Sequence, residues 1–154
     1  MLEFNKDFVL VDLDAADSDA VILALAGSLQ NAGLVDPGYG AATIERERHH
    51  ATGLPTRPFP IAFPHADADG VIESALAVAT LKQPVGFYNM ADPEEELLVE
   101  IVIMLANKSP EEQIQTLRSL AELFGEPEKL TELRNLSSAA AIADWLSEEL
   151  SLQE

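Results

Sequence analysis

The segment from Leu97 to Ala106 is almost wholly apolar, and it constrains the fold more than any other stretch of this chain. It is too short to cross a membrane as a helix, and a short apolar run of this kind is typical of a buried strand. Soon after it, Ser109-Pro110-Glu111-Glu112 offers a capping serine, a proline at the first helical position and acids near the positive helix end. A buried strand followed by such a helix start predicts a fold in which helices cover a sheet.

The rest of the chain also alternates strand-like and helix-like segments. Asp17 is a candidate cap for a helix that Gly33 would end, and Asp36-Pro37 begins a second helix that carries Arg46. The segment from Gly53 to Pro60 is so rich in glycine and proline that we expect it to stay outside the sheet. We expect strands at 8–13, 61–63, 74–81 and 85–88, the last two joined near Gln83-Pro84, a solvated loop at 92–96, and helices at 17–31, 37–49, 110–124, 126–134 and 137–150. This order predicts an α/β fold, a single domain over residues 1–154 with a mixed sheet flanked by helices on its faces.

Composition limits what the chain can bind. Its 154 residues suffice for one domain with a real core, and a net charge of −18 disfavours binding to nucleic acid or to anionic membrane surfaces. The chain has no cysteine, which excludes disulfides, thiolate nucleophiles and thiolate metal sites. The first residues lack the basic and apolar regions of a signal peptide, so we expect a cytoplasmic protein. The acidity has two interpretations, ordinary solubility in an acidic proteome and adaptation to a cytoplasm of high salt.

His65 is the first candidate for chemistry, because Pro64 and the apolar run Ile61 to Phe63 would hold its backbone rigidly at the end of a strand. A neutral imidazole is a nucleophile near pH 7, and phosphoryl transfer needs positive charge on the transferred oxygens. Arg46, nineteen residues earlier, would supply that charge through a planar guanidinium that matches phosphate. The competing interpretation is that His65 is an ordinary loop histidine and that Arg46 pairs with neighbouring acids.

Metal binding is another interpretation of the same histidine. The segment from His65 to Gly70 is similar to half of a calcium loop, but His65 and Leu76 stand where that loop needs oxygen ligands. A transition-metal site could combine His65 and Asp67 with His49 or His50. These last two histidines are, however, expected at a solvated helix end, where positive charge suits the helix dipole. The sequence contains no Walker, dinucleotide-binding or Gly-x-Ser-x-Gly motif, so it does not indicate a nucleotide site.

Several motifs occur in a fixed order around these two residues. They are Ala32-Gly33-Leu34-Val35, Thr43-Ile44-Glu45-Arg46-Glu47, Thr52-Gly53, Ile61-Ala62-Phe63-Pro64-His65, Ile101 to Leu105 and Gln113 to Leu123. Together they resemble the EIIA domains of the sugar phosphotransferase system (PTS), in the fructose–mannitol superfamily. The resemblance covers roughly residues 4–150, and its most specific part is the combination of the Arg46 and Thr52 motifs with the Ile-Ala-x-Pro-His segment.

The resemblance implies a role for each of these residues in a phosphotransferase component. His65 would be the phosphohistidine that accepts a phosphoryl group from HPr and passes it to a cysteine of a separate EIIB, which serves an EIIC permease in sugar transport. Arg46 would stabilise the transferred oxygens, and Thr52 would position its loop or touch the phosphate. Such a domain needs no metal and no cofactor.

Two departures from the mannitol and fructose types indicate the branch. Those types carry a second active-site histidine at the start of the late helix, where this chain has Gln113, and the loop between Thr52 and His65 is longer here. Both features are similar to the galactitol-type branch, so galactitol or a related carbohydrate is the expected substrate of the transport system. Glutamine donates hydrogen bonds but adds no charge and shuttles no proton, so Gln113 would orient the phosphate or the imidazole. The alternatives are a regulatory EIIA paralogue, whose phosphorylation state controls other proteins, and a binding module that lacks the chemistry.

Overall fold

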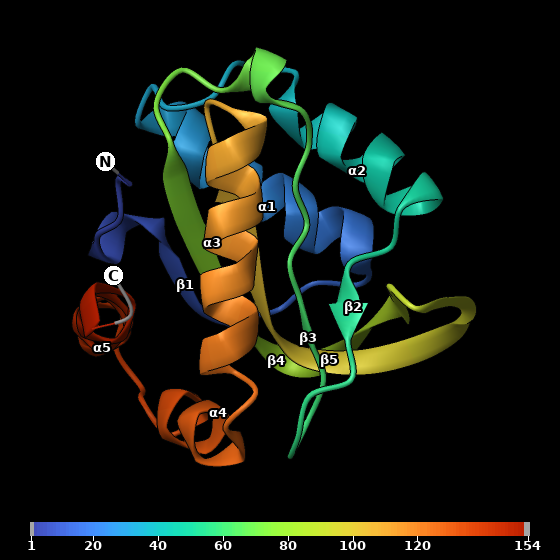
Figure 1. The fold of residues 1–154 in the computed structure, drawn as a ribbon, viewed down its shortest axis with the longest axis vertical. Coiled ribbons are helices and arrows are strands. Elements are labelled where there is room, and N and C mark those ends of the chain that lie inside the picture. The colour runs from blue at the N-terminus through green and yellow to red at the C-terminus, as the bar shows by residue number, and fades with distance from the viewer. Residues whose placement is uncertain (1, 153–154) are drawn as a thin grey trace.

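A mixed five-stranded sheet forms the centre of the structure, a computed structural model that describes residues 2–152 and the side chains of residues 2–150 (Figure 1). The strands are β1 (Val9–Leu13), β2 (Gly53–Leu54), β3 (Ile61–Ala62), β4 (Ala75–Asn89) and β5 (Asp92–Ala106). The helices are α1 (Ser18–Asn31), α2 (Tyr39–His49), α3 (Pro110–Leu123), α4 (Pro127–Arg134) and α5 (Ala139–Leu152), with short 3-10 helices η1 (Lys6–Phe8) and η2 (Ala68–Gly70). Residues 1 and 153–154 of the predicted domain lie outside the described residues.

The β4–β5 hairpin contributes the two longest strands of the sheet. Its two long strands pair antiparallel, β1 runs parallel to β4, and β3 runs parallel to β5. The short strand β2 pairs antiparallel with β3 and also reaches the far end of β4. Parallel and antiparallel pairs therefore coexist, and the predicted α/β fold with a mixed sheet is confirmed.

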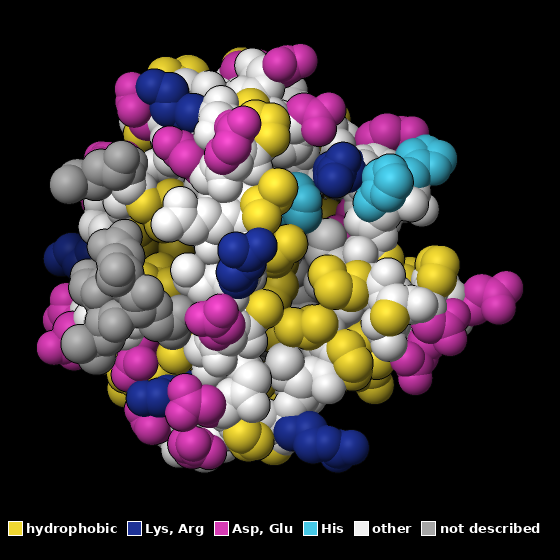
Figure 2. Space-filling model, viewed as in Figure 1, with side chains coloured by type: hydrophobic (Ala, Val, Ile, Leu, Met, Phe, Trp, Pro, Cys, Tyr) yellow, Lys and Arg dark blue, Asp and Glu magenta, His cyan; other side chains and the backbone are white. Residues whose placement is uncertain are grey.

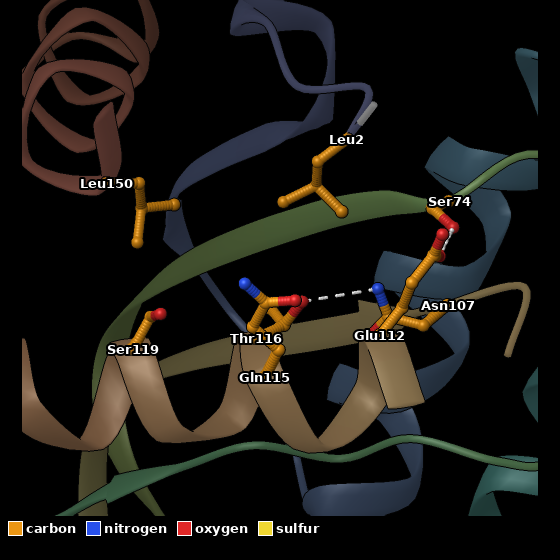
Figure 3. A pocket seen from close by; sticks show the side chains of 8 residues that line it. All are labelled: Leu2, Ser74, Asn107, Glu112, Gln115, Thr116, Ser119 and Leu150. Atoms are coloured by element: carbon orange, nitrogen blue, oxygen red, sulfur yellow. Dashed lines mark hydrogen bonds between the residues drawn. The ribbon is translucent and has the colours of Figure 1, made fainter. Parts of the chain in front are cut away.

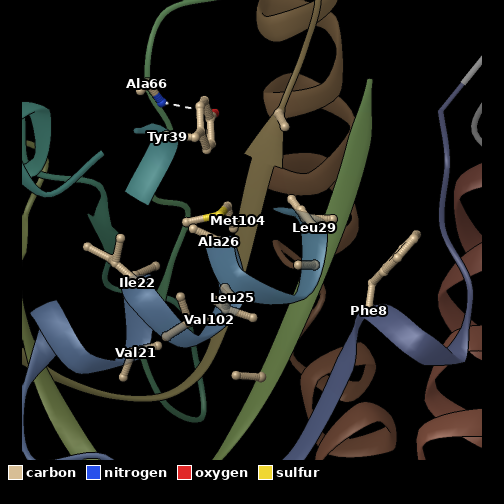
Figure 4. Packing of buried hydrophobic residues seen from close by; sticks show 14 of the residues in the cluster. Phe8, Val21, Ile22, Leu25, Ala26, Leu29, Tyr39, Ala66, Val102 and Met104 are labelled. Atoms are coloured by element: carbon tan, nitrogen blue, oxygen red, sulfur yellow. Dashed lines mark hydrogen bonds between the residues drawn. The ribbon is translucent and has the colours of Figure 1, made fainter. Parts of the chain in front are cut away.

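Helices cover both faces of the sheet, with α3 in front of it and α1 behind it in Figure 1. Alternate residues of β4 serve two cores: Ala77 packs in the cluster beneath α1 and α2, and Val78 packs in the cluster beneath α3, α4 and α5. Figure 4 shows the first cluster, in which Leu25 and Leu29 of α1 lie against the sheet. A strand buried on both faces is apolar throughout, which explains the nearly continuous hydrophobic runs in the sequence.

The expected pair of strands at 74–81 and 85–88 is one strand, β4, so that prediction was wrong. The antiparallel partner continues on both sides of an irregularity, because Thr80 pairs with Ile101 and Val85 pairs with Val99. Pro84 lies inside this bulge. Residues in a bulge do not donate to the partner strand, so the missing N–H of proline is tolerated there. Arg134 of α4 donates to the carbonyl oxygen of Leu81, at the start of the bulge, at 3.1 Å. The polar residues near Gln83-Pro84, which suggested a break between two strands, thus form a bulge within β4, and Arg134 binds this bulge.

Two further expectations about loops were wrong. The acidic segment 92–96 begins β5, and it is exposed because it forms the protruding end of the hairpin. Gly53 and Leu54 form β2 within the loop that was expected to stay outside the sheet. Gly53 permits this pairing because a Cβ at its position would overlap the carbonyl oxygen of Tyr88. A strand of two residues leaves no periodicity in the sequence by which it could be predicted.

The helix signals were more reliable than the strand signals. The side chain of Asp17 caps α1 by accepting from the N–H of Ala20 at 2.9 Å, and Gly33 follows the helix with φ of 77°. Ser109 caps α3 by accepting from the N–H of Glu112 at 3.2 Å. Helix α2 starts two residues later than expected, because Asp36 first accepts a hydrogen bond from the N–H of Gly38 at 3.0 Å. Within residues 2–152, every helix is too short or too polar to span a membrane.

Candidate functional site

His65 lies where the chain leaves the sheet. After β3 the chain continues beside β5, and the N–H of Leu105 donates to the carbonyl oxygen of Pro64 at 3.1 Å. His65 itself forms an isolated parallel bridge with Leu105. Phe63 is fully buried, whereas His65 is half-buried. The apolar run therefore anchors the backbone in the core while the imidazole emerges at the edge.

One ring nitrogen of His65 is fixed by the backbone. Nδ1 lies 2.9 Å from the carbonyl oxygen of Phe63, and because a carbonyl only accepts, Nδ1 is the donor. In the neutral ring this leaves the lone pair on Nε2. Burial lowers the pKa of His65, and the charge of Arg46 lowers it further, against the opposing effect of the Phe63 carbonyl. The geometry and the environment both favour a neutral imidazole with a nucleophilic Nε2.

A cavity of about 320 Å³ brings together residues that are far apart in the sequence. Arg46 comes from α2, His65 from the chain after β3, and Gln113 from the first turn of α3. The complete lining is Arg46, His65, Ala66, Asp67, Ala68, Asn107, Ser109, Pro110, Gln113, Ile114 and Leu117. Three of the four residues that the sequence suggested for the site thus share one cavity.

Two donors at this cavity lack a partner in the described part of the chain. Nε of Arg46 and Nε2 of Gln113 are both buried without a hydrogen bond. Buried donors are normally paired, so both groups are available to an acceptor that enters the cavity. Ser109 and Pro110 also line it, so the N-terminal end of α3 and its positive dipole face the same space. Cationic and hydrogen-bonding groups therefore surround His65 in a manner that suits a phosphoryl group.

Arg46 already has a weak partner. Its guanidinium lies 3.7 Å from a carboxylate oxygen of Asp67, whose side chain is 85% exposed. An exposed pair of this kind contributes about 0–1 kcal/mol. An anion bound next to His65 can therefore compete for Arg46 at little cost. Asp67 itself opposes anion binding, because it adds a negative charge at the rim of the cavity.

Thr52 lies outside this lining, and Glu47 engages both its hydroxyl and its N–H. Its hydroxyl donates to Oε1 of Glu47 at 2.8 Å and its N–H donates to Oε2 at 2.9 Å. Burial raises the pKa of Glu47, opposed by these two hydrogen bonds and by Arg46. Thr52 is not part of the lining of the His65 cavity. It ties the end of α2 to the start of β2.

A second cavity, of about 230 Å³, lies on the other side of the first turns of α3 (Figure 3). There the hydroxyl of Ser74 donates to Glu112 at 2.6 Å and accepts from the N–H of Lys108 at 3.0 Å. Asn107 borders both cavities, and its amide nitrogen donates to Thr116 at 3.3 Å. These bonds attach the first two turns of α3 to the residues that flank β4 and β5, so Glu112 is held on one side while Gln113 lines the cavity on the other.

Sequence reasoning missed Asn107, a buried residue whose side-chain oxygen has no partner among the described residues. Its only sequence signal is its position directly after the buried strand. The other two histidines weighed as metal ligands, His49 and His50, lie apart from the cavity lining: His49 contacts Glu45 at 3.0 Å and is exposed, as is His50. Among the side chains of residues 2–150, no group of three or more His, Asp or Glu is arranged to hold a metal ion.

Comparison with known proteins identifies the family. The model of "Phosphoenolpyruvate-dependent sugar phosphotransferase system, EIIA 2" matches residues 3–149. The chain belongs to this EIIA family. Its membership supports a role in phosphoryl transfer, as a component of that system. The resemblance to PTS EIIA domains that the motifs indicated is therefore confirmed.

Two curated relatives bear on the branch of this EIIA. The galactitol-specific EIIA component of Escherichia coli K12 is 27% identical over 121 residues, which cover 79% of this chain and 80% of that protein. The transcriptional regulator ManR of Bacillus subtilis is 32% identical over 139 residues, which cover 90% of this chain. The chain spans only 20% of the length of ManR.

Solved structures share the fold at lower identity. Enzyme IIAMTL of E. coli, in its complex with phosphorylated enzyme IIBMTL, superimposes with a TM-score of 0.78 at 22% identity, over 98% of this chain and 99% of that one. The nitrogen regulatory protein IIA-Ntr of Neisseria meningitidis superimposes with a TM-score of 0.74 at 21% identity, over 92% of this chain and 94% of that one. The fold is thus shared by a protein named as an enzyme IIA and by one named as a nitrogen regulatory protein.

Proposed function

We propose that this EIIA is a phosphocarrier in which His65 accepts a phosphoryl group from phospho-HPr and passes it to a cysteine of a separate EIIB. The EIIB would serve an EIIC permease that takes up galactitol or a related carbohydrate. The observation that carries the proposal is the state of His65. Its Nδ1 donates to the carbonyl of Phe63, and the imidazole lines a cavity together with donors of Arg46 and Gln113 that have no partner among the described residues.

The chemistry follows from this arrangement. Nε2 of the neutral ring attacks phosphorus, a P–Nε2 bond forms, and the P–N bond to the histidine of the donor breaks. The proton on Nδ1 stays in place, because the Phe63 carbonyl holds it and thereby stabilises the positive charge that develops on the ring. In the second transfer, the cysteine thiolate of EIIB attacks phosphorus and the P–Nε2 bond breaks. No metal and no cofactor takes part.

Arg46 has the role of holding the equatorial oxygens of the transferring group. Phosphoryl transfer is accelerated mainly by positioning and by charge stabilisation, and a guanidinium serves both. Gln113 would donate a neutral hydrogen bond to the same oxygens. Thr52 would act indirectly, by fixing the loop through Glu47 rather than by contacting phosphate.

The surface next to the cavity supports a protein as the exchange partner. An apolar hollow of about 310 Å³ adjoins it, lined by Leu54, Phe63, Met90, Ile114, Leu117, Arg118 and Ala121. Ile114 belongs to both linings and is 59% exposed. Figure 2 shows hydrophobic side chains gathered about a histidine at the centre of this face, with Asp and Glu mainly towards the rim. An apolar surface around a reactive histidine suits transient docking of HPr and EIIB in turn.

Regulation is the second candidate, favoured by the 32% identity to the transcriptional regulator ManR. In that case phosphorylated His65 would be read by another protein instead of passing its phosphoryl group to EIIB. The two candidates share the first transfer and differ only in the second. Genes for EIIB and EIIC beside this gene would favour uptake.

The test of the first transfer is the mass of the intact protein. After incubation with enzyme I, HPr and phosphoenolpyruvate, the wild type should gain one phosphate that is labile in acid and stable in base. His65→Ala should gain none, and His49→Ala should behave as the wild type because His49 lies outside the cavity lining. A phosphate adduct that persists in His65→Ala would remove His65 from the proposal.

The second transfer is tested by adding a galactitol-type EIIB to the purified phosphoprotein. Loss of phosphate from this chain, with gain of a cysteine-bound phosphate on EIIB, is the expected result for uptake. A phosphoprotein that is stable to every EIIB of the same genome would favour regulation.

A further inference from the structure

Tyr39 is a buried tyrosine that has no role in the proposed transfer, yet its hydroxyl touches the backbone next to His65. The side chain is 1% exposed. Its hydroxyl donates to the carbonyl oxygen of Leu105 at 2.7 Å and accepts from the N–H of Ala66 at 3.1 Å. The second of these bonds appears in Figure 4, where Tyr39 and Ala66 face each other. Ala66 directly follows His65 in the chain, and Leu105 faces His65 across the bridge.

The hydroxyl bonds to both sides of the bridge between His65 and Leu105. In a parallel bridge of this register, the N–H of Leu105 donates to the carbonyl of Pro64, and the N–H of Ala66 points towards the carbonyl of Leu105. The Tyr39 hydroxyl accepts from that N–H and donates to that carbonyl. It therefore fixes the chain immediately after His65 against the end of β5.

The same residue also fixes the helix that carries Arg46. Tyr39 is the first residue of α2, and Tyr39, Thr43 and Arg46 stand at i, i+4 and i+7, so they share one face of the helix. Thr43 is fully buried, and its hydroxyl donates to the carbonyl of Tyr39 at 2.8 Å. One phenol therefore joins the start of α2, the end of β5 and the chain after His65.

We propose that Tyr39 is a positioning residue for phosphoryl transfer: its hydroxyl sets where His65 stands relative to Arg46. This inference rests on the proposed function of His65. Tyr39 does not touch the phosphoryl group, and it acts through the backbone of Ala66 and Leu105. Burial raises the pKa of Tyr39 to about 12, so the hydroxyl keeps its proton, and with it the bond to Leu105, at neutral pH.

The decisive variant is Tyr39→Phe, which keeps the buried ring and removes only the hydroxyl. Tyr88→Phe is the matched control, because Tyr88 is the other tyrosine of the chain and is 47% exposed on the hairpin. We expect Tyr39→Phe to accept phosphate from phospho-HPr roughly tenfold to a hundredfold more slowly at saturating donor, since small displacements of reacting groups cost that much. The KM for phospho-HPr should stay near the wild-type value, because the docking surface is unchanged.

A second measurement separates positioning from general damage and needs no phosphoryl donor. The ¹⁵N shifts of the His65 ring report the tautomer, which in the wild type should be Nδ1–H. Tyr39→Phe should weaken that preference and shift the amides of residues 64–67 and 105, while the rest of the spectrum stays folded. A Tyr39→Phe protein with wild-type kcat and an unchanged His65 tautomer would overturn the proposal.

A failure of the proposed function and a failure of the proposed role of Tyr39 give different results. If the wild type accepts no phosphate, the proposed function is wrong, and the His65 tautomer alone still decides whether Tyr39 positions the ring. If Tyr39→Phe does not fold, hydrogen exchange in the wild type takes its place. A strongly protected Ala66 amide supports the hydroxyl bridge, and an Ala66 amide that exchanges as fast as an open loop overturns it.

Discussion

Nδ1 of His65 donates a hydrogen bond to the carbonyl oxygen of Phe63, two residues earlier in the chain, at a distance of 2.9 Å. This short-range bond depends on the proline between them, because Pro64 fixes its own φ and favours an extended Phe63. It selects the tautomer, orients the ring and leaves the lone pair of the neutral ring on Nε2. A local sequence pattern therefore explains the most important chemical feature of the site.

The first prediction concerns pH. The pKa of His65 is lowered mainly by burial, so the neutral, nucleophilic ring should persist below the ordinary histidine range near 6.5. Phosphorylation should hold its rate as pH falls through 6.5 and decline only at the lower pKa. The protonated ring is less favourable in the folded state than in the unfolded chain. The contribution of His65 to stability is therefore present above the unfolded pKa and lost as pH falls through the folded one.

Titration of the His65 ring protons by NMR measures this pKa without any partner protein. Arg46→Ala should raise it, because the charge of Arg46 is one of the causes of the shift. A midpoint at or above the ordinary histidine value in the wild type would contradict the role of burial.

The second prediction concerns Arg46. Loss of one charge-stabilising donor typically costs about 2.7–4 kcal/mol of barrier, so Arg46→Ala should slow transfer by roughly 10² to 10³. Arg46→Lys keeps the charge but loses the planar fork, and it should also be clearly slower than wild type. Rates of phosphate acceptance from HPr, measured by rapid quench, check both variants.

Arg48→Ala is the control for Arg46, because Arg48 lies on the same helix, is 61% exposed and pairs with Asp19 and Glu45. Its rate should match the wild type. Equal rates for Arg46→Ala and Arg48→Ala would mean that Arg46 serves only its contact with Asp67.

The third prediction separates Thr52 from the chemistry. Thr52→Val removes the hydroxyl bond to Glu47 and should lower the free energy of unfolding by about 1 kcal/mol. Transfer should stay close to the wild-type rate, because Thr52 is absent from the lining of the cavity. Thr131→Val, at an exposed helical position, should affect stability less. A large loss of rate in Thr52→Val without loss of stability would instead indicate direct contact with phosphate.

Particular residues show how far the sequence predicts this protein. Asp17, Gly33 and Ser109 carry local signals for helix ends, and the structure confirms them because a cap depends on only a few neighbouring residues. The bulge at residues 81–84 looked like a break because its polar residues interrupt an apolar run. The continuity of β4 across it depends on β5 and on Arg134, which are distant in sequence.

The site shows the same division between local and long-range information. Arg46, His65 and Gln113 were suggested by motifs, but a motif does not say how three elements meet at one cavity. Tyr39 gave no signal at all, since a tyrosine at the start of a helix is ordinary until its hydroxyl is seen between Ala66 and Leu105. Contacts to backbone atoms are invisible in sequence, because any residue can supply them.

The last prediction concerns Gln113, whose Nε2 is buried at the His65 cavity without a partner in the described part of the chain. Gln113→Glu replaces this donor with a negative charge that repels the incoming phosphate, so phosphorylation should slow by roughly 10² or more. Gln113→His should be tolerated, because a histidine at that position can still donate a hydrogen bond. Gln115→Glu is the matched control: Gln115 lies two residues later on the same helix and lines the opposite cavity of Figure 3. If Gln113→Glu and Gln115→Glu phosphorylate at the same rate, Gln113 is an ordinary polar residue of an exposed turn. A slow Gln113→Glu beside an active Gln115→Glu attributes the effect to the cavity and not to added charge on α3.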